Sequence, residues 1–203
     1  CYDARLLSDY TEKVVRGQKD EVQTLLNTAV RMYLLIAVPA VAGVWAVSYQ
    51  AAYALFAPEY VEGHVVMFWV ALGMMFLGLT EYSIKNWELH ANTSAIFKRS
   101  MIGGVVNVGL NLVLVKLLDS YFIASVTTFL GFFVYFLLAV FGTRKHLIWH
   151  IKARSLFNIL LSAAVMAGVI KLMESVLPEG KLYLALFIFC GIIVYGLMLT
   201  LTG

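Results

Sequence analysis

Six long apolar stretches dominate the chain, and its basic residues are distributed unevenly between them. The stretches cover residues 32–56, 64–86, 101–118, 122–142, 156–173 and 182–202. Twelve of the fifteen lysine and arginine residues precede the first stretch or surround the gaps after the second and fourth; the others are Lys116, Lys171 and Lys181. A chain that crosses a bilayer repeatedly keeps its basic loops in the cytoplasm. The pattern therefore predicts a multi-pass membrane protein whose two ends are both cytoplasmic.

The composition agrees with this prediction. Hydrophobic residues make up 62% of the chain and charged residues 13%, whereas soluble domains average about 45–50% and about 25%. About 20 helical residues span the hydrocarbon of a bilayer. A helix also pairs its own backbone groups where no water is present to do so. We therefore predict an all-α fold with six transmembrane helices.

The net charge of +3 does not indicate a nucleic-acid partner, because the basic residues are divided among three separate loops. Anionic lipid head groups attract basic segments that lie beside a membrane. Membrane lipid is therefore the expected partner of these loops. The two cysteines, Cys1 and Cys190, are too few for a disulfide framework.

Residues 1–31 are amphipathic, with charged positions between apolar ones at helical spacing. They predict a cytoplasmic lead-in to a transmembrane lobe at residues 32–203. Within the lead-in, Asp20 and Glu21 are expected to open a helix, because acidic side chains are favourable at its positive end. The chain begins at Cys1 without a methionine, and we expect it to be a fragment of a longer protein.

The sequence lacks the common catalytic motifs. It contains no phosphate-binding Walker loop, no His-Glu-x-x-His metal motif and no Gly-x-Ser-x-Gly nucleophile turn. His146 and His150 are four residues apart and could share a helix face as metal ligands, but no third ligand lies beside them. Histidines at the membrane interface are the favoured interpretation. The sequence thus predicts neither an enzyme nor a metal site nor a cofactor.

Polar residues inside the apolar stretches are better guides to function, because they are costly in lipid. Asn107 and Asn111 lie near the middle of the third stretch, on one helix face. They predict either hydrogen bonds between helices or the lining of a polar path, and the sequence favours neither. Glu81 and Lys85 have the spacing of a helical ion pair near the cytoplasmic end of the second stretch.

Arg31 immediately precedes the first stretch, and Pro39 lies within it. Arg31 stands at its cytoplasmic start and is expected either to attract an anionic head group or to be an ordinary boundary arginine. Pro39 removes one backbone hydrogen bond and predicts a structural hinge. Membrane helices tolerate such a proline, and transporters use it.

Four segments together resemble a known family. They are residues 10–15, the first span with Arg31 and Pro39, the run 55–60 and the run 107–114. Family members typically show a Leu-Phe-Gly-x-x-Tyr-like exit and an Asn-x-x-x-Asn-Leu-x-Leu segment at this separation, although Ala57 replaces the usual glycine here. The chain thus resembles the carboxyl-terminal half of the polysaccharide-biosynthesis proteins, the lipid-linked oligosaccharide flippases of the multidrug/oligosaccharidyl-lipid/polysaccharide exporter superfamily.

The resemblance implies one six-helix lobe of a two-lobe transporter in the cytoplasmic membrane of a prokaryote. Its partner would be a missing amino-terminal six-helix half, and the two lobes would work by alternating access. The implied cargo is an oligosaccharide on polyprenyl pyrophosphate, which moves without covalent chemistry. The candidate residues for a substrate cavity are Arg31, Lys85, Asn107 and Asn111.

Other functions stay open on the residues alone. An ion-coupled drug or small-solute exporter of the same superfamily would more often bury a carboxylate at mid-depth, and Glu81 lies near one end of its stretch. A membrane-embedded glycosyl- or acyltransferase would need an acidic or histidine motif, which the sequence lacks. A non-transporting scaffold is the third alternative.

Overall fold

A computed structural model of the chain describes residues 19–56, 58–118, 120–143, 149–178 and 180–202. Residues 1–18, which form most of the predicted lead-in, lie outside this part, and so do His146 and Ala57. Within the described residues the chain forms helices, in this order: α2 (Lys19–Leu55), the 3₁₀-helix η1 (Pro58–Gly63), α3 (His64–Ser83), α4 (Lys85–Leu89), α5 (Thr93–Leu110), the π-helix η2 (Asn111–Val115), α6 (Lys116–Leu118), α7 (Tyr121–Thr143), α8 (Ala153–Val176) and α9 (Lys181–Thr202).

Six helical segments of the described chain are long and apolar enough to cross a membrane, as judged from length and composition. They are Asp20–Leu55, Tyr60–Leu89, Thr93–Leu118, Phe122–Thr143, Ala153–Val176 and Lys181–Thr202. Each contains the roughly 20 residues that a spanning helix needs. The predicted all-α fold with six candidate transmembrane helices is confirmed.

The first helix is much longer than the apolar stretch predicts. α2 has 37 residues and begins at Lys19 instead of Met32, so it is about 55 Å long at 1.5 Å per residue. The hydrocarbon of a bilayer is only about 30 Å thick. Asp20 and Glu21 lie in the first turn of α2, as expected for acidic residues at the positive end of a helix. The polar segment before Arg31 therefore extends the spanning helix without a break.

The third span also begins before its apolar stretch. α5 starts at Thr93, where the side chain of Asn92 accepts a hydrogen bond of 3.2 Å from the backbone amide of Ala95. Asparagine is a favoured residue at this capping position because it pairs an amide that the first turn leaves free. The helix start is therefore set by a polar cap, while Met101 marks only where the residues become apolar.

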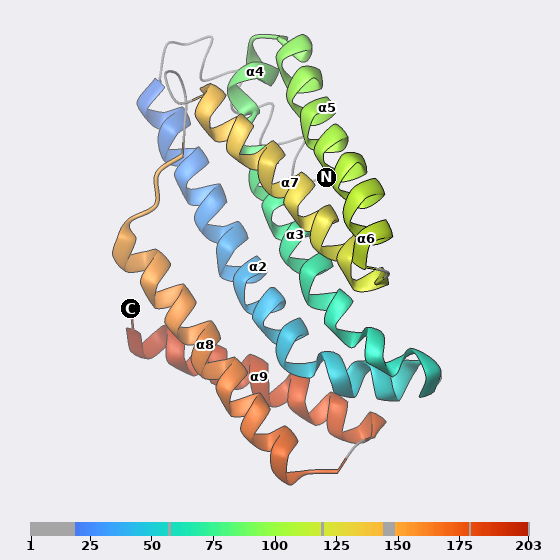
Figure 1. Ribbon diagram of the computed structural model, residues 1–203. Helices are drawn as coiled ribbons and strands as arrows, with labels where there is room; N and C mark the ends of the chain where they lie inside the picture. Colours follow the sequence, from blue (N-terminus) through green and yellow to red (C-terminus); the bar gives the residue numbers. More distant parts are fainter. Residues whose placement is uncertain (1–18, 57, 119, 144–148, 179, 203) are drawn as a thin grey trace.

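The helices form two groups on either side of α2 (Figure 1). α3, α5 and α7 form one group, in which α3 packs most extensively against α7. α8 and α9 pack against each other and form the second group. α2 contacts α3 on one side and both α8 and α9 on the other, so it connects the two groups.

Buried apolar side chains hold α2 to both groups. One cluster joins α2 to α3 and α8, and its members are Val30, Leu34, Val38, Leu79, Ile159 and Ala163. A second cluster joins α2 to α8 and α9, and its members are Ala46, Met166, Ala167, Ile170 and Phe187. In a membrane the packing of such side chains stabilises helix association mainly through van der Waals contact. The helix that connects the groups is thus fixed by close packing along most of its length.

An aromatic seam holds α3 to α7. Ring contacts with centroids between 4.9 and 6.5 Å apart join Trp69, Phe76, Phe129, Phe133 and Phe136. The seam continues to Trp149, whose ring stacks on Phe136 and whose indole nitrogen donates a 3.0 Å hydrogen bond to the hydroxyl of Ser83. Tilted and edge-on aromatic pairs of this kind add to the energy of burial.

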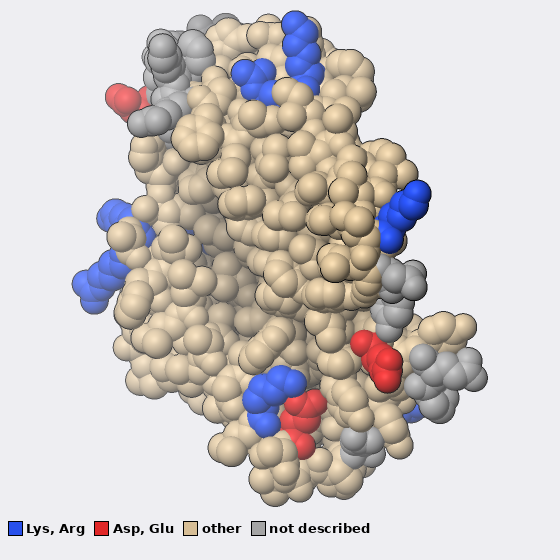
Figure 2. All heavy atoms as spheres, in the orientation of Figure 1, with Lys and Arg blue, Asp and Glu red and all other residues tan. Residues whose placement is uncertain are grey.

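Consecutive long helices run in opposite directions (Figure 1). The start of α5 and the start of α8 therefore lie towards the same end of the molecule as the start of α2, which we call the basic end. Figure 2 shows that the middle of one face carries mostly uncharged residues, whereas charged side chains lie near its ends and edges. This distribution suits a molecule whose middle is in hydrocarbon, where charged groups are costly.

Candidate functional site

Arg31 lies in a pocket of about 550 Å³ between α2, α8 and α9, near the basic end. Two further cations line this basic pocket, Lys152 immediately before α8 and Arg154 in its first turn. The remaining lining residues are Leu35, Ser155, Asn158, Ile159, Leu199 and Thr200. Figure 2 shows basic side chains at the edge of the molecule beside the start of α8. The fold therefore brings Arg31 together with two cations that lie more than a hundred positions later in the sequence.

Within the part of the chain that the structure describes, no carboxylate neutralises the positive charge of the basic pocket. Among the described residues, Arg31, Lys152 and Arg154 form no ion pair. The start of α8 adds to the positive charge of the pocket, because no side chain caps its free backbone amides. The free amides and the helix dipole give such a start a partial positive charge. The pocket is consequently suited to an anion with several oxygen atoms.

A hydrogen bond between α8 and α9 shapes the floor of the basic pocket. The side-chain amide of Asn158 donates to the carbonyl oxygen of Thr202 at 2.6 Å. This carbonyl belongs to the last turn of α9, where the helix itself supplies no donor. Asn158 therefore ties the end of α9 to α8 beside the three cations.

An apolar groove of about 440 Å³ adjoins the basic pocket, and Leu35 lines both. The groove runs between the same three helices. α2 contributes Leu35, Ile36, Pro39, Ala40, Gly43, Val44 and Val47, α8 contributes Met166 and Ile170, and α9 contributes Ile188, Gly191, Ile192 and Tyr195. Small residues at several of these positions leave the space that forms the groove.

Pro39 and Tyr195 both affect the backbone carbonyl of Leu35, at the end of the groove that adjoins the basic pocket. A proline has no amide hydrogen, so Pro39 leaves the carbonyl of Leu35, four residues earlier, without its helical donor. The hydroxyl of Tyr195 on α9 donates to that carbonyl at 2.9 Å. Pairing from a neighbouring helix is how membrane proteins accommodate a proline. The structure thus supplies from α9 the bond that Pro39 removes from α2.

Lys85, the second candidate cation, lies elsewhere. It opens α4, is buried, and its ammonium group forms an ion pair of 2.9 Å with the carboxylate of Glu88. The sequence favours Glu81, four residues earlier, as a partner of Lys85, and the structure places the carboxylate of Glu88 beside Lys85 one turn later in α4. The charge of Lys85 is therefore balanced within α4, unlike that of Arg31.

Asn107 and Asn111 form a hydrogen-bonded pair at the contact between α5 and α7. The Asn111 amide donates to the side-chain oxygen of Asn107 at 3.0 Å, and the Asn107 amide donates to the Thr127 carbonyl at 3.4 Å. Asn107 also lines a small pocket of about 310 Å³ between α3, α5 and α7. The structure therefore gives this pair an interhelical contact and, at Asn107, a pocket surface. It does not bring the pair into the basic pocket.

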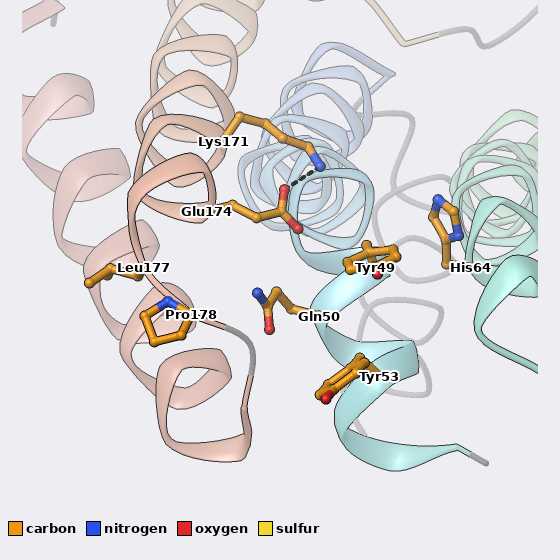
Figure 3. A pocket seen from close by; sticks show the side chains of 8 residues that line it. All are labelled: Tyr49, Gln50, Tyr53, His64, Lys171, Glu174, Leu177 and Pro178. Atoms are coloured by element: carbon orange, nitrogen blue, oxygen red, sulfur yellow. Dashed lines mark hydrogen bonds and ion pairs between the residues drawn. The ribbon is translucent and has the colours of Figure 1, made fainter. Parts of the chain in front are cut away.

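A third pocket of about 770 Å³ lies near the opposite end of the molecule, where the end of α2 meets the end of α8 and the start of α3. Figure 3 shows Lys171 and Glu174 directed at each other above Gln50, with Tyr49 and Tyr53 along α2. The ion pair measures 2.6 Å, and the second carboxylate oxygen of Glu174 is buried without a hydrogen-bond partner. Because its lysine is paired, this pocket attracts an anion less than the basic pocket does.

Sequence reasoning identified Arg31 but missed the residues that complete its pocket. Lys152 and Arg154 were interpreted only as basic loop residues, because nothing in a single sequence shows that α8 packs against α2. The sequence gives only a weak indication of the role of Tyr195. Pro39 shows that the Leu35 carbonyl needs a hydrogen-bond donor, but not which residue supplies it. Among the described residues, no three histidine, cysteine, aspartate or glutamate side chains are placed to hold a metal ion.

A solved structure of the lipid II flippase MurJ in its inward closed conformation is similar to this fold. The TM-score is 0.76 at 16% sequence identity, and the match covers 95% of this chain. This chain spans only 41% of the length of that solved chain. At this identity the likeness establishes a shared arrangement of helices.

The sequence itself gives a more specific result. It has no match among curated proteins, but the sequence profile of one protein family, described as "Lipid II flippase MurJ", matches residues 4–191. The resemblance to flippases of lipid-linked precursors is thereby confirmed, whereas the narrower assignment to polysaccharide-biosynthesis proteins is replaced. A flippase is a transporter, in agreement with the prediction that the chain is no enzyme. The match extends over most of the chain, which therefore belongs to the MurJ family of lipid II flippases.

Proposed function

We propose that the full protein moves a lipid-linked precursor across the cytoplasmic membrane of a prokaryote. The observation that carries this proposal is the match of residues 4–191 to the family of lipid II flippases. The six apolar helices support it, since a protein that moves a lipid across a bilayer has to span the bilayer itself.

The proposed cargo carries a saccharide on polyprenyl pyrophosphate. Arg31 is the best placed of the candidate residues for the pyrophosphate, because it lies in a pocket with two further cations. Lys85, Asn107 and Asn111 are proposed to line the path of the polar group at other stages. Their present hydrogen bonds and ion pair would have to exchange for contacts with the cargo.

The proposed mechanism is alternating access between two lobes. This chain would be the carboxyl-terminal lobe, residues 32–203, with its lead-in and both ends in the cytoplasm. An amino-terminal six-helix half would be its partner. Pro39 is proposed as the hinge, because α2 connects the two helix groups and its hydrogen-bond ladder is interrupted there.

Translocation by the full-length protein tests this proposal. Purified protein is reconstituted into vesicles with fluorescent lipid II, and the fraction of label that reaches the opposite leaflet is measured by chemical quenching. We expect faster movement than in protein-free vesicles. We also expect Arg31→Gln to reduce the initial rate about tenfold, as loss of one charge-assisted contact predicts.

Lys98→Gln is the matched control, since Lys98 is an exposed cation near the same end of the molecule on α5. It should leave the rate unchanged. If wild-type protein moves lipid II no faster than empty vesicles do, the proposed function is wrong. If movement is fast but Arg31→Gln equals Lys98→Gln, the flippase function stands and the role of Arg31 is wrong.

A further inference from the structure

The pocket of about 770 Å³ at the end opposite the basic end, which we call the polar pocket, has no part in the function proposed above. Most of its polar side chains come from two helices: α2 contributes Tyr49, Gln50 and Tyr53, and α8 contributes Lys171 and Glu174 (Figure 3). The ammonium nitrogen of Lys171 lies 2.6 Å from a carboxylate oxygen of Glu174. The two charges cancel, so the polar pocket is suited to a ligand without net charge.

The polar pocket lies about one hydrocarbon thickness from the basic end. Nineteen positions of α2 separate Arg31 from Gln50, which corresponds to about 28 Å of helix axis. The hydrocarbon of a bilayer is about 30 Å thick, and tyrosines such as Tyr49 and Tyr53 are frequent at its boundaries. With Arg31 at one boundary, the polar pocket lies at the other, at the depth of lipid head groups. This depth favours a lipid head group as its occupant.

Lys171 offers a cation to such a head group. Its ammonium nitrogen lies 5.5 Å from the centre of the Trp45 ring on α2, and an aromatic ring attracts a cation at this distance. The side chain of Lys171 is nevertheless 37% exposed. An ammonium group has three donors, and Glu174 accepts from one of them. The ammonium group can therefore also bind a phosphate oxygen.

Glu174 lacks a donor at one of its two oxygens. One oxygen pairs with Lys171, whereas the other is buried and has no hydrogen-bond partner among the described residues. A buried acceptor that has lost water without gaining a donor is unfavourable. The side chain keeps 16% of its surface exposed, so a small rotation can bring this oxygen to the polar pocket. A ligand with positively charged N–H donors would satisfy it best.

We propose that the polar pocket binds the head group of a zwitterionic lipid that carries a phosphate and a primary ammonium, in the leaflet opposite the basic end. The phosphate would lie beside Lys171 and the ammonium beside Glu174, so each charge of the lipid would face an opposite charge of the protein. Leu177 and Pro178 add apolar surface to the pocket, where the first carbons of the lipid chains would lie.

A lipid in this position would join the end of α2 to the end of α8, because both helices line the polar pocket. The site goes beyond the proposed function, since it requires no lipid-linked cargo. It is also separate from the basic pocket, which lies near the other end of the same two helices.

Competition for a photoreactive lipid tests the site in the full-length protein in detergent. The probe is phosphatidylethanolamine with a diazirine near the start of one acyl chain, and mass spectrometry quantifies its crosslinks to residues 45–64 and 171–178. The competitors are unlabelled phosphatidylethanolamine, phosphatidylcholine, phosphatidylglycerol and soluble phosphoethanolamine. Phosphatidylcholine keeps both charges but has no N–H donor, and phosphatidylglycerol has no ammonium. We expect phosphatidylethanolamine to compete about tenfold better than each of the other three.

Two variants should change the lipid preference in different directions. Glu174→Gln should weaken competition by phosphatidylethanolamine about tenfold. It should strengthen competition by phosphatidylglycerol, because Lys171 loses its carboxylate partner. Lys171→Gln should weaken competition by both lipids, because both phosphates lose their cation. Misfolding would weaken all binding alike and could not produce the gain for phosphatidylglycerol.

Matched controls lie near the same end of the molecule. Glu62→Gln removes an exposed carboxylate of η1, and Lys181→Gln removes an exposed cation at the first position of α9. Both lie outside the residues that line the polar pocket. Both variants should therefore keep the lipid preference of the wild type.

The outcomes decide the site independently of lipid II translocation. A preference for phosphatidylethanolamine that Glu174→Gln shifts towards phosphatidylglycerol would support it, even if translocation failed. Equal competition by phosphatidylcholine, or equal behaviour of Glu174→Gln and Glu62→Gln, would overturn it. Absence of crosslinks at residues 45–64 and 171–178 would also overturn it. Equal competition by phosphoethanolamine would show a site for a soluble molecule and overturn the assignment to a lipid.

Discussion

Tyr195 compensates at a single atom for a defect that Pro39 introduces. Its hydroxyl pairs the Leu35 carbonyl that the proline leaves free. A hydrogen bond between membrane helices contributes about 0.6 kcal/mol on average and up to about 1.7 kcal/mol. The bond also joins α9 to α2 at the boundary between the basic pocket and the apolar groove. This hydrogen bond thus stabilises α2 at the point where Pro39 interrupts its helical hydrogen bonds.

Replacing Tyr195 by phenylalanine tests this compensation. Tyr195→Phe should lower the unfolding free energy of the full-length protein by about 1 kcal/mol, measured by thermal unfolding in detergent. On the background of Pro39→Ala, which restores a helical donor for the Leu35 carbonyl, the same change should cost much less. Tyr60→Phe is the control, because Tyr60 is an exposed residue of η1. Equal costs of Tyr195→Phe on both backgrounds would contradict the compensation.

At the level of helices, the contact between α5 and α7 depends on two glycines. A Cβ at Gly131 would lie 2.7 Å from the Cβ of Asn107, and one at Gly103 would lie 2.9 Å from the Gly131 carbonyl oxygen. Small residues allow membrane helices to approach this closely. The approach brings the Asn107 amide within hydrogen-bond distance of the Thr127 carbonyl. The asparagine contact and the glycine contact are therefore parts of one interface.

Adding a methyl group to this interface should separate the helices. Gly131→Ala is expected to destabilise the full-length protein by about 1–3 kcal/mol, the usual cost of overpacking. The measurement is the midpoint of thermal unfolding in detergent. Gly109→Ala on α5 is the matched control, because its Cβ meets no neighbour, and alanine favours the helix by up to about 1 kcal/mol. If Gly131→Ala proved as stable as Gly109→Ala, the close packing of α5 on α7 would be wrong.

For the whole molecule, the sequence was informative about helices and less so about their neighbours. The six apolar stretches predict the six spans, because hydrophobic length is a local property. The starts of α2 and α5 differ from the predicted ones, since polar residues such as Lys19 and Asn92 continue or cap a helix outside the apolar stretch. Apolar periodicity has no information about these polar turns.

The candidate site was predictable only in part, for a related reason. Arg31 stands out because an arginine at the edge of an apolar stretch needs an explanation. Its neighbours Lys152 and Arg154 lie immediately before α8 and in its first turn, more than a hundred positions later. Their contact depends on which helices pack together, and a single sequence does not specify this. Lys85 stood out equally, yet its charge is balanced locally by Glu88.

The account as a whole depends on six membrane crossings with the basic end in the cytoplasm. Single cysteines at Tyr60, Thr93, Ala153 and Val176, in a full-length protein with Cys1 and Cys190 replaced by serine, test it directly with an impermeant maleimide. Thr93 and Ala153 begin α5 and α8 at the basic end, whereas Tyr60 in η1 and Val176 at the end of α8 lie towards the opposite end. Positions 60 and 176 should react in intact cells, and positions 93 and 153 only after the membrane is opened. Labelling of position 93 or 153 in intact cells would contradict the orientation and the number of crossings on which the proposed transport depends.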